Sequence, residues 1–251
     1  MGCLMLIGEN ERRYFIPESG GTVRIEGLGV VDSGRLASYT EGERVTVAGR
    51  NFILLRPTLS DMMSYLERGP QVILEKDASL IAHFLDVRCG STVLEIGAGS
   101  GSLSLLLLHR VGAQGRIITY DNRLEHLSVA RSNIERFGLE NSWYPVLGDG
   151  RRFVGSSFAD AACMDIPDPW NALRTCWDAL RPGGMLASYS PTVNQTEQTV
   201  TEALKLPFMF ETSFEVMLRR IVVSPGATRH SFEGPGHTGY ISLFRRLGGN
   251  K

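Results

Sequence analysis

The chain has 251 residues, with 43% hydrophobic residues, 21% charged residues and a formal net charge of −1. This composition is ordinary for a soluble globular protein, and the length allows one large domain or one large and one small domain. The near-zero net charge excludes a general electrostatic attraction to polyanions, although arginine pairs at 12–13, 219–220 and 245–246 could form local basic patches.

The cysteines and the apolar runs indicate a cellular setting. Four cysteines, at positions 3, 89, 163 and 176, lack the C-x-x-C spacing of a zinc site, so no metal is expected and a reducing compartment suits them. No run approaches the roughly 20 apolar residues of a membrane span, and the first apolar run is too short for a signal peptide. We therefore expect a cytoplasmic protein without a membrane segment.

Residues 1–57 predict a small β domain. Short apolar stretches separated by Gly, Ser and Asp clusters are typical of strands, which we expect at 4–7, 14–16, 22–25, 43–47 and 52–55. Residues 58–75 predict a connecting helix and linker, with Thr58 capping a helix over 62–67 and Asp61 in the capping-box position. A second helix starts near Lys76 and opens the main domain, 76–251.

Residues 92–102 form the centre of the main domain. The apolar strand 92–96 breaks into Gly97, Gly99 and Gly101 and then enters a helix. Glycines allow positive φ and close approach of a ligand, and a helix start offers unpaired N–H groups. A dinucleotide site needs Gly or Ala where this chain has Ser102. A glycine-rich turn without a ligand is the alternative.

With Glu95 included, this stretch resembles motif I of the class I S-adenosylmethionine-dependent methyltransferases. The resemblance implies S-adenosylmethionine as the cofactor. It places Glu95 near the methionine end, with Gly97, Gly99, Gly101 and Ser102 forming the turn beneath the cofactor.

Two further acids follow the next two predicted strands. Asp121 ends the strand 116–120, where a carboxylate can accept hydrogen bonds from both ribose hydroxyls; its alternative role is to cap the next helix. Asp149 follows the strand 143–147, and the methyltransferase resemblance places it at the adenine amino group. A simple Gly-Asp-Gly turn is the alternative for Asp149.

The second half of the main domain repeats the alternation of strands and helices. The strand 160–164 leads into Asp165 in a loop restricted by two prolines, at the sheet edge where α/β folds carry their chemistry. The expected elements that follow are a helix at 171–180, a turn at 181–184, a strand at 185–189, a helix at 195–204, and strands at 214–223 and 237–246. The pattern predicts an α/β fold with a doubly wound, seven-stranded sheet.

Several blocks together resemble a more specific family, the tRNA (adenine-N1)-methyltransferases of the adenine-58 type. The blocks are residues 56–59, 68–73, 76–77, 95–101, 165–170, 189–191 with Gln195, and 236–240. The resemblance implies a class I methyltransferase with a small N-terminal β domain that assembles as a homotetramer. Its members transfer a methyl group to N1 of adenine 58 in the T-loop of tRNA, and the archaeal branch also modifies adenine 57. The resemblance also implies a cofactor contact from Gln71.

Three positions depart from the family pattern. Leu74-Glu75 replaces a Tyr-Pro pair that many relatives carry, Ile221 stands where the family has Trp, and Arg229-His230 replaces Arg-Pro. The first replaces an aromatic contact to the cofactor that the family pattern implies. Taken together, the differences bear on the contacts to tRNA more than on the cofactor site.

Two residues are expected to serve the reaction itself. Positive charge builds on adenine as its ring nitrogen is methylated, and a carboxylate beside the base would stabilise that charge; we assign this role to Asp165. A cap or a cofactor contact is the alternative for Asp165. Tyr189 is expected to stack on the extruded base, with a structural role as its alternative. Competing functions are methylation of a protein or small molecule, and a non-catalytic tRNA-binding subunit.

Overall fold

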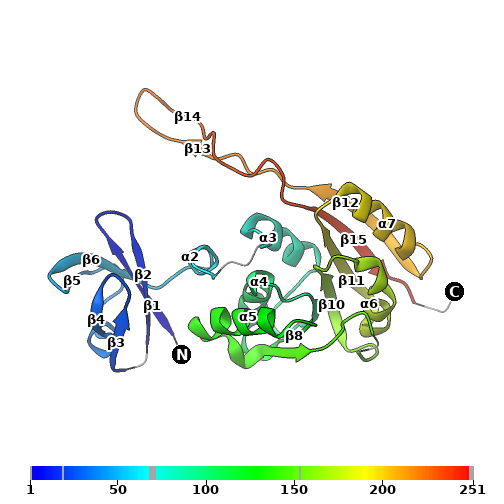
Figure 1. Ribbon diagram of the computed structural model, residues 1–251, viewed down its shortest axis with the longest axis horizontal. Coiled ribbons are helices and arrows are strands. Elements are labelled where there is room, and N and C mark those ends of the chain that lie inside the picture. Colours follow the sequence, from blue (N-terminus) through cyan, green and yellow to red (C-terminus); the bar gives the residue numbers. More distant parts are fainter. Residues whose placement is uncertain (1, 19, 68–71, 153, 249–251) are drawn as a thin grey trace.

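The computed structural model describes residues 2–18, 20–67, 72–152 and 154–248. A small β region at the N-terminus is joined through a short helix to a larger α/β region, and a long hairpin leaves the larger region near its C-terminal strands (Figure 1). Among the described residues, no helix has both the length and the apolar character needed to cross a bilayer.

The N-terminal region is a four-stranded antiparallel sheet with an additional hairpin. The sheet order is β2-β1-β6-β5, from β1 (Cys3–Gly8), β2 (Arg13–Pro17), β5 (Arg44–Val47) and β6 (Arg50–Leu55), and the hairpin pairs β3 (Thr22–Ile25) with β4 (Gly29–Asp32). All five expected strands are present. The sequence reasoning missed β4 and the one-turn helix α1 (Ser33–Leu36), which Asp32 caps through the Arg35 amide.

Both faces of the β1–β2 pair are buried, which explains the apolar runs there. Leu4 and Leu6 pack under the β3–β4 hairpin. Met5 and Phe15 face the other way, and the Phe15 ring stacks on Tyr65 at a centroid distance of 4.1 Å. The small sheet is therefore anchored to the larger region by an apolar contact.

The connecting helix α2 (Leu59–Ser64) has the predicted capping box. Thr58 Oγ1 accepts from the Asp61 backbone N–H, and the Asp61 carboxylate accepts from the Thr58 N–H. The cap prediction is confirmed, but α2 begins three residues earlier than the expected 62–67, because the cap at Thr58 starts the helix at once.

The larger region contains a seven-stranded sheet in the order β12-β15-β11-β10-β7-β8-β9, in which only β15 runs antiparallel to its neighbours. Its strands are β7 (Thr92–Ile96), β8 (Arg116–Asp121), β9 (Trp143–Leu147), β10 (Ala159–Met164), β11 (Leu180–Ser190), β12 (Phe208–Glu215) and β15 (Tyr240–Arg246). The expected α/β fold with a doubly wound sheet and a small N-terminal β region is confirmed.

Helices cover both faces of this sheet. They are α3 (Glu75–Phe84), α4 (Ser102–Val111), α5 (Leu124–Arg136), α6 (Leu173–Ala179) and α7 (Val193–Ala203), with 3₁₀ turns at Gly112–Gln114, Glu140–Ser142 and Pro169–Asn171. Val93 of β7 faces the core shared with α3, α4 and α5, whereas its neighbour Leu94 faces the core shared with α6. This alternation follows the two-residue period of a strand.

Two expected elements have different bounds in the structure. The expected turn 181–184 lies inside β11, where the pairing with β10 skips from Leu180 to Met185 and Gly183 takes a φ of 82°. The expected strand 214–223 is wrong, because β12 ends at Glu215 and the chain then enters a hairpin with the short strands β13 (Ile221–Val222) and β14 (Arg229–His230). This hairpin, residues 216–239, extends away from the sheet and is called the arm below (Figure 1).

Candidate active site

The three glycines between β7 and α4 are required for different reasons. All have positive φ, 98° at Gly97, 52° at Gly99 and 80° at Gly101. A Cβ on Gly97 would lie 2.2 Å from the backbone oxygen of Asp165, and a Cβ on Gly101 would lie 3.0 Å from Ala130. A Cβ on Gly99 would meet no atom of the described chain within 4 Å. Packing therefore demands Gly97 and Gly101, whereas Gly99 leaves space for a ligand.

A small cavity lies over this turn. The residues that line it are Val72, Ile73, Gly97, Ala98, Gly99, Ser100, Ser102, Leu103 and Asp165. Of the site residues expected from the sequence, the structure thus brings Gly97, Gly99, Ser102 and Asp165 together at one cavity. Gln71 lies outside the described residues.

Asp165 reaches the cavity because it directly follows β10, next to β7. Its backbone N–H donates to the Ile96 oxygen at 2.9 Å, which fixes the start of the loop. Within the described chain, no group donates a hydrogen bond to the Asp165 carboxylate. Burial raises the pKa of Asp165 to about 6, and the charge of Asp121 adds to the rise. An unpartnered, half-buried carboxylate is a suitable place for a positive charge.

Glu95 lies below the turn and does not line the cavity. Its Oε2 accepts from Ser104 Oγ at 2.5 Å and from Thr119 Oγ1 at 2.7 Å, whereas Oε1 is buried with no partner in the described residues. Burial raises the pKa of Glu95 to about 7, and the charges of Asp165 and Asp121 add to the rise. The two hydrogen bonds lower the pKa but do not offset the effect of burial. Its contact with the methionine end of a cofactor stays a prediction.

Asp121 ties the glycine turn to the start of α5. Its Oδ2 accepts from the Ala98 N–H at 3.0 Å and lies 3.1 Å from His126 Nδ1, and its Oδ1 accepts from the Arg123 N–H at 2.9 Å. The local role that the sequence left open is therefore present. The ribose contact stays a prediction, and lone pairs remain available on both oxygens.

Asp149 lies beyond the end of β9 and is engaged by arginine. Arg151 donates to Asp149 Oδ1 from Nε at 2.8 Å and to Oδ2 from Nη2 at 3.1 Å, and these hydrogen bonds lower the pKa of Asp149. A third donor of Arg151, Nη1, reaches Asp168 at 2.8 Å. Asp149 is not among the cavity-lining residues, and its adenine contact stays a prediction.

Two serines in the turn behave differently. Ser102 Oγ donates to the Ile73 backbone oxygen at 2.8 Å and so joins the helix start to the segment that covers the turn. Ser100 Oγ is buried at the cavity and has no partner in the described chain. The sequence analysis missed Ser100, although a hydroxyl between two glycines of the turn was the available signal.

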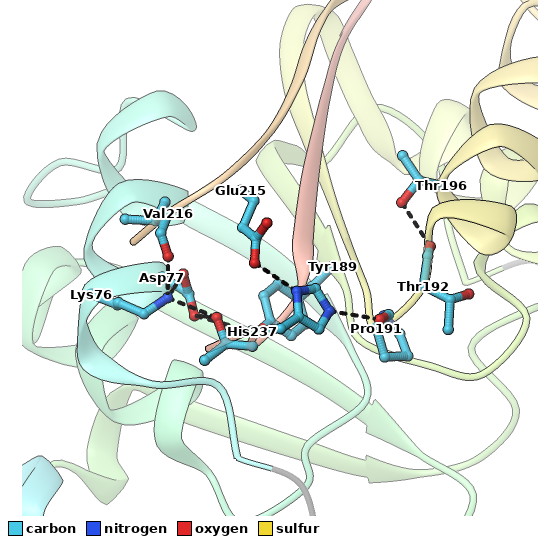
Figure 2. Close-up of polar contacts among 10 residues, drawn as sticks. Lys76, Asp77, Tyr189, Pro191, Thr192, Thr196, Glu215, Val216 and His237 are labelled. Carbon is cyan, nitrogen blue, oxygen red and sulfur yellow. Dashed lines mark hydrogen bonds and ion pairs between the residues drawn. The ribbon is translucent and has the colours of Figure 1, made fainter. Parts of the chain in front are cut away.

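Tyr189 lies in a buried polar network with Asp77 and Thr238. Its hydroxyl donates to Asp77 Oδ2 at 3.3 Å, and Thr238 Oγ1 donates to the same oxygen at 2.8 Å. Lys76 Nζ donates to Asp77 Oδ1 at 2.8 Å (Figure 2). Burial raises the pKa of the Tyr189 hydroxyl. With 8% of Tyr189 exposed and Gly239 against its ring, stacking on a base stays a prediction.

The same network holds both ends of the arm. Lys76 Nζ also donates to the Val216 oxygen at 2.8 Å and to Thr238 Oγ1 at 2.7 Å. His237 lies between Glu215 and Pro191, with 2.6 Å from Nδ1 to Oε1 and 2.9 Å from Nε2 to the Pro191 oxygen (Figure 2). The 76–77 and 236–240 blocks, which carried the family resemblance, thus meet in space.

These residues could hold a cofactor with a cationic, hydroxyl-bearing group. Gly99 offers room, Ser100 offers a hydrogen bond that nothing in the described chain uses, and Asp165 offers an unpaired negative charge. S-adenosylmethionine carries a positive sulfonium, so the donor and acceptor set fits the expected cofactor. The described His, Cys, Asp and Glu residues include no group of three placed to hold a metal ion.

Known proteins resemble this chain along almost its whole length. The tRNA (adenine(57)-N(1)/adenine(58)-N(1))-methyltransferase TrmI of Methanocaldococcus jannaschii is 31% identical over 96% of this chain and 94% of its own length. The tRNA (adenine(58)-N(1))-methyltransferase TrmI of Thermus thermophilus is 30% identical over 98% of this chain and 97% of its own length.

A solved structure agrees with the fold. A SAM-dependent O-methyltransferase from Thermotoga maritima superposes with a TM-score of 0.84 at 28% identity, covering 100% of this chain and 94% of that one. The family model of the tRNA methyltransferase complex GCD14 subunit matches residues 52–233, which include the glycine turn, Asp165 and most of the arm. The chain therefore belongs to the GCD14 family of tRNA methyltransferase subunits.

Proposed function

We propose that this protein transfers a methyl group from S-adenosylmethionine to N1 of adenine 58 in the T-loop of tRNA. Family membership and the names of the M. jannaschii and T. thermophilus relatives support the reaction and the substrate. The observation that carries the proposal is the unpartnered Asp165 carboxylate at the cavity over the glycine turn. The name of the M. jannaschii relative adds adenine 57 as a second position to test.

The cofactor would be held by the residues around the glycine turn. We assign its binding to Gly97, Gly99, Gly101 and Ser102 of the turn, to Asp121, Asp149 and Asp165, and to Gln71 and Glu95 as the sequence predicted. When bound, S-adenosylmethionine supplies an electrophilic methyl group on a sulfonium. The start of α4 adds backbone N–H groups that favour a carboxylate.

Asp165 is the proposed catalytic residue. The attacking lone pair lies on adenine N1 itself, so no base is required to begin the transfer. Positive charge develops on the ring as the new N–C bond forms, and the exocyclic amino group becomes more acidic. The Asp165 carboxylate would stabilise that charge and accept a hydrogen bond from the amino group. Tyr189 remains a candidate for contact with the extruded base.

We also propose that the protein works as a homotetramer, with residues 1–57, 58–75 and 76–251 as β domain, linker and methyltransferase domain. The arm supports assembly, because Met217, Val223 and Phe232 are each at least 80% exposed. A two-stranded ribbon is marginally stable alone, and a cluster of exposed apolar side chains marks an interface. Light scattering after gel filtration tests this proposal, and a fully active monomer would contradict it.

Methyl transfer to unmodified tRNA tests the proposed function. Labelled S-adenosylmethionine should label the tRNA, and methylation of N1 should stop reverse transcription at position 58, because it blocks the pairing edge of the base. A tRNA with guanine at position 58 is the matched control and should lose that stop. Cofactor binding without label in tRNA would favour a protein or small-molecule substrate. Absence of cofactor binding would favour a non-catalytic tRNA-binding subunit.

A further inference from the structure

Asn133, near the C-terminal end of α5, is completely buried and lies beside the glycine turn. Its side-chain amide makes three hydrogen bonds. Oδ1 accepts from the Glu67 backbone N–H at 3.0 Å, and Nδ2 donates to the Glu67 oxygen at 3.1 Å and to the Ser100 oxygen at 2.8 Å. One side chain therefore joins the end of the linker helix region to the glycine turn.

The partners fix which way the amide points. The Glu67 N–H requires an acceptor, whereas the two carbonyl oxygens require donors, so only one orientation of the amide satisfies all three. Replacing Asn133 would remove the partner of both Glu67 backbone groups and of the Ser100 oxygen, and the loss costs most at Ser100, where the hydrogen bond is buried.

Of the two residues that Asn133 joins, Ser100 lines the cavity, and Glu67 precedes the linker residues Val72 and Ile73 that line it. Ser100 lines the cavity and carries the buried hydroxyl without a partner. On the linker side, Val72 and Ile73 line the cavity, and the Ile73 oxygen accepts from Ser102 Oγ. The linker is thus tied to the glycine-turn region at Glu67 through Asn133 and at Ile73 through Ser102.

A second residue of α5, Arg136, also contacts the linker. Arg136, one turn after Asn133, donates to the Glu67 carboxylate at 2.7 Å and lies over the Tyr65 ring with its guanidinium carbon 5.4 Å from the ring centroid. Arg136 contacts only the linker side, and its side chain is partly exposed. Asn133 also contacts the glycine turn, through the Ser100 oxygen.

We propose that Asn133 is a positioning residue for S-adenosylmethionine: it holds the linker and the Ser100 peptide at the spacing that the bound cofactor requires. The inference rests on the cofactor site proposed above. It assigns a role in cofactor affinity to a side chain that touches neither the cofactor nor the substrate. The cofactor affinity of the folded protein should therefore depend on Asn133 separately from stability.

The test measures S-adenosylmethionine affinity by titration calorimetry in the full-length protein. Asn133→Leu keeps a similar volume but pairs none of the three groups, and Asn133→Asp keeps the acceptor but removes both donated hydrogen bonds. We expect both substitutions to raise the Kd by about tenfold or more. At saturating cofactor, kcat for tRNA should stay within about threefold of the wild-type value, because Asn133 acts on binding.

Ile134→Val is the matched control. Ile134 is the next residue of α5, is completely buried in the apolar core and makes no part of the cavity wall. It should lower the melting temperature while leaving the Kd within about twofold of wild type. If the Asn133 variants also lower only the melting temperature, the side chain is merely structural and the inference fails. Wild-type protein that does not bind the cofactor would instead overturn the proposed site.

Hydrogen exchange on the wild-type protein tests the same idea without a variant. The Glu67 amide donates to Asn133, so its exchange reports directly on this connection. We expect saturating S-adenosylmethionine to slow exchange of the Glu67 amide. Unchanged exchange at Glu67, alongside slower exchange in the glycine turn, would show that the connection does not respond to the cofactor and would overturn the inference.

Discussion

Replacing Asp165 with Asn removes one negative charge and keeps the size of the side chain. Since no donor in the described chain contacts this carboxylate, the substitution breaks no hydrogen bond of the fold, and its effect should fall on the reaction. Loss of one preorganised electrostatic partner typically lowers kcat by about 10² to 10³, or about 3 to 4 kcal/mol. We expect a loss of this size at saturating tRNA and cofactor.

The pH dependence gives a second measure of the same role. The carboxylate acts only when ionised, and its pKa is raised to about 6. In the free protein about 91% of the carboxylate is then ionised at pH 7 and about 9% at pH 5, so kcat/KM for the cofactor should fall about tenfold between these values. The acid limb should disappear in Asp165→Asn, because the amide does not titrate.

Single-turnover methylation with labelled cofactor measures both effects, and titration calorimetry measures the cofactor Kd. Asp168→Ala is the control, because the Asp168 carboxylate is already bound by Arg151 and Asn171 at 2.8 Å each. A large loss of kcat in Asp168→Ala, together with a small loss in Asp165→Asn, would assign the catalytic role to Asp168 and not to Asp165. A large rise in Kd for Asp165→Asn, with kcat retained, would move the residue from catalysis to cofactor binding.

Four further substitutions test the structure around the site. Glu95→Gln should remove a pH dependence of stability. Burial raises the pKa from 4.5 to about 7, so the folded state loses about 3 kcal/mol as the pH rises through that window, and urea unfolding at pH 5 and 8 measures it. Gly97→Ala should strongly destabilise the folded protein, because its Cβ would overlap the Asp165 backbone oxygen. Gly99→Ala should fold at a cost of about 1 to 2 kcal/mol, because its φ is positive, and should bind the cofactor weakly. Thermal unfolding measures the stability of both variants, and calorimetry measures their cofactor affinity. Asp77→Ala should cost about 3 to 5 kcal/mol because it leaves the Lys76 ammonium, whose side chain is only 12% exposed, without a carboxylate to balance its charge. A urea midpoint close to wild type would contradict this.

The local patterns of the fold could be predicted from the sequence because short-range physics sets them. The capping box at Thr58 and the alternation of Val93 and Leu94 follow from local hydrogen bonding and strand periodicity. The arm could not be predicted in the same way. Its exposed Met217 and Val223 are as apolar as residues of a buried strand, and a sequence pattern does not show what surrounds them.

The candidate site was predicted in part for a similar reason. The glycine turn and Asp165 were found because strand ends gather at one edge of a parallel sheet. Asn133 was missed because an asparagine inside a helix carries no distinctive spacing, and Ser100 was missed although its place between two glycines of the turn was an available signal. Asp77 meets Tyr189 across 112 residues of sequence, and only the tertiary structure shows that contact.

The three acids at the ends of β7, β8 and β10 differ in what they can offer a ligand. Glu95 is sealed beneath the turn with Ser104 and Thr119, and Asp121 accepts from the amides of Ala98 and Arg123. Asp165 alone among the three lines the cavity with no donor from the described chain. Burial is the main cause of the raised pKa values of Glu95 and Asp165, and the negative charge of Asp121 adds to both. A cation over the turn would favour the ionised form of each carboxyl group. Binding of a positively charged cofactor should therefore lower both pKa values, which links cofactor binding to proton release below about pH 7.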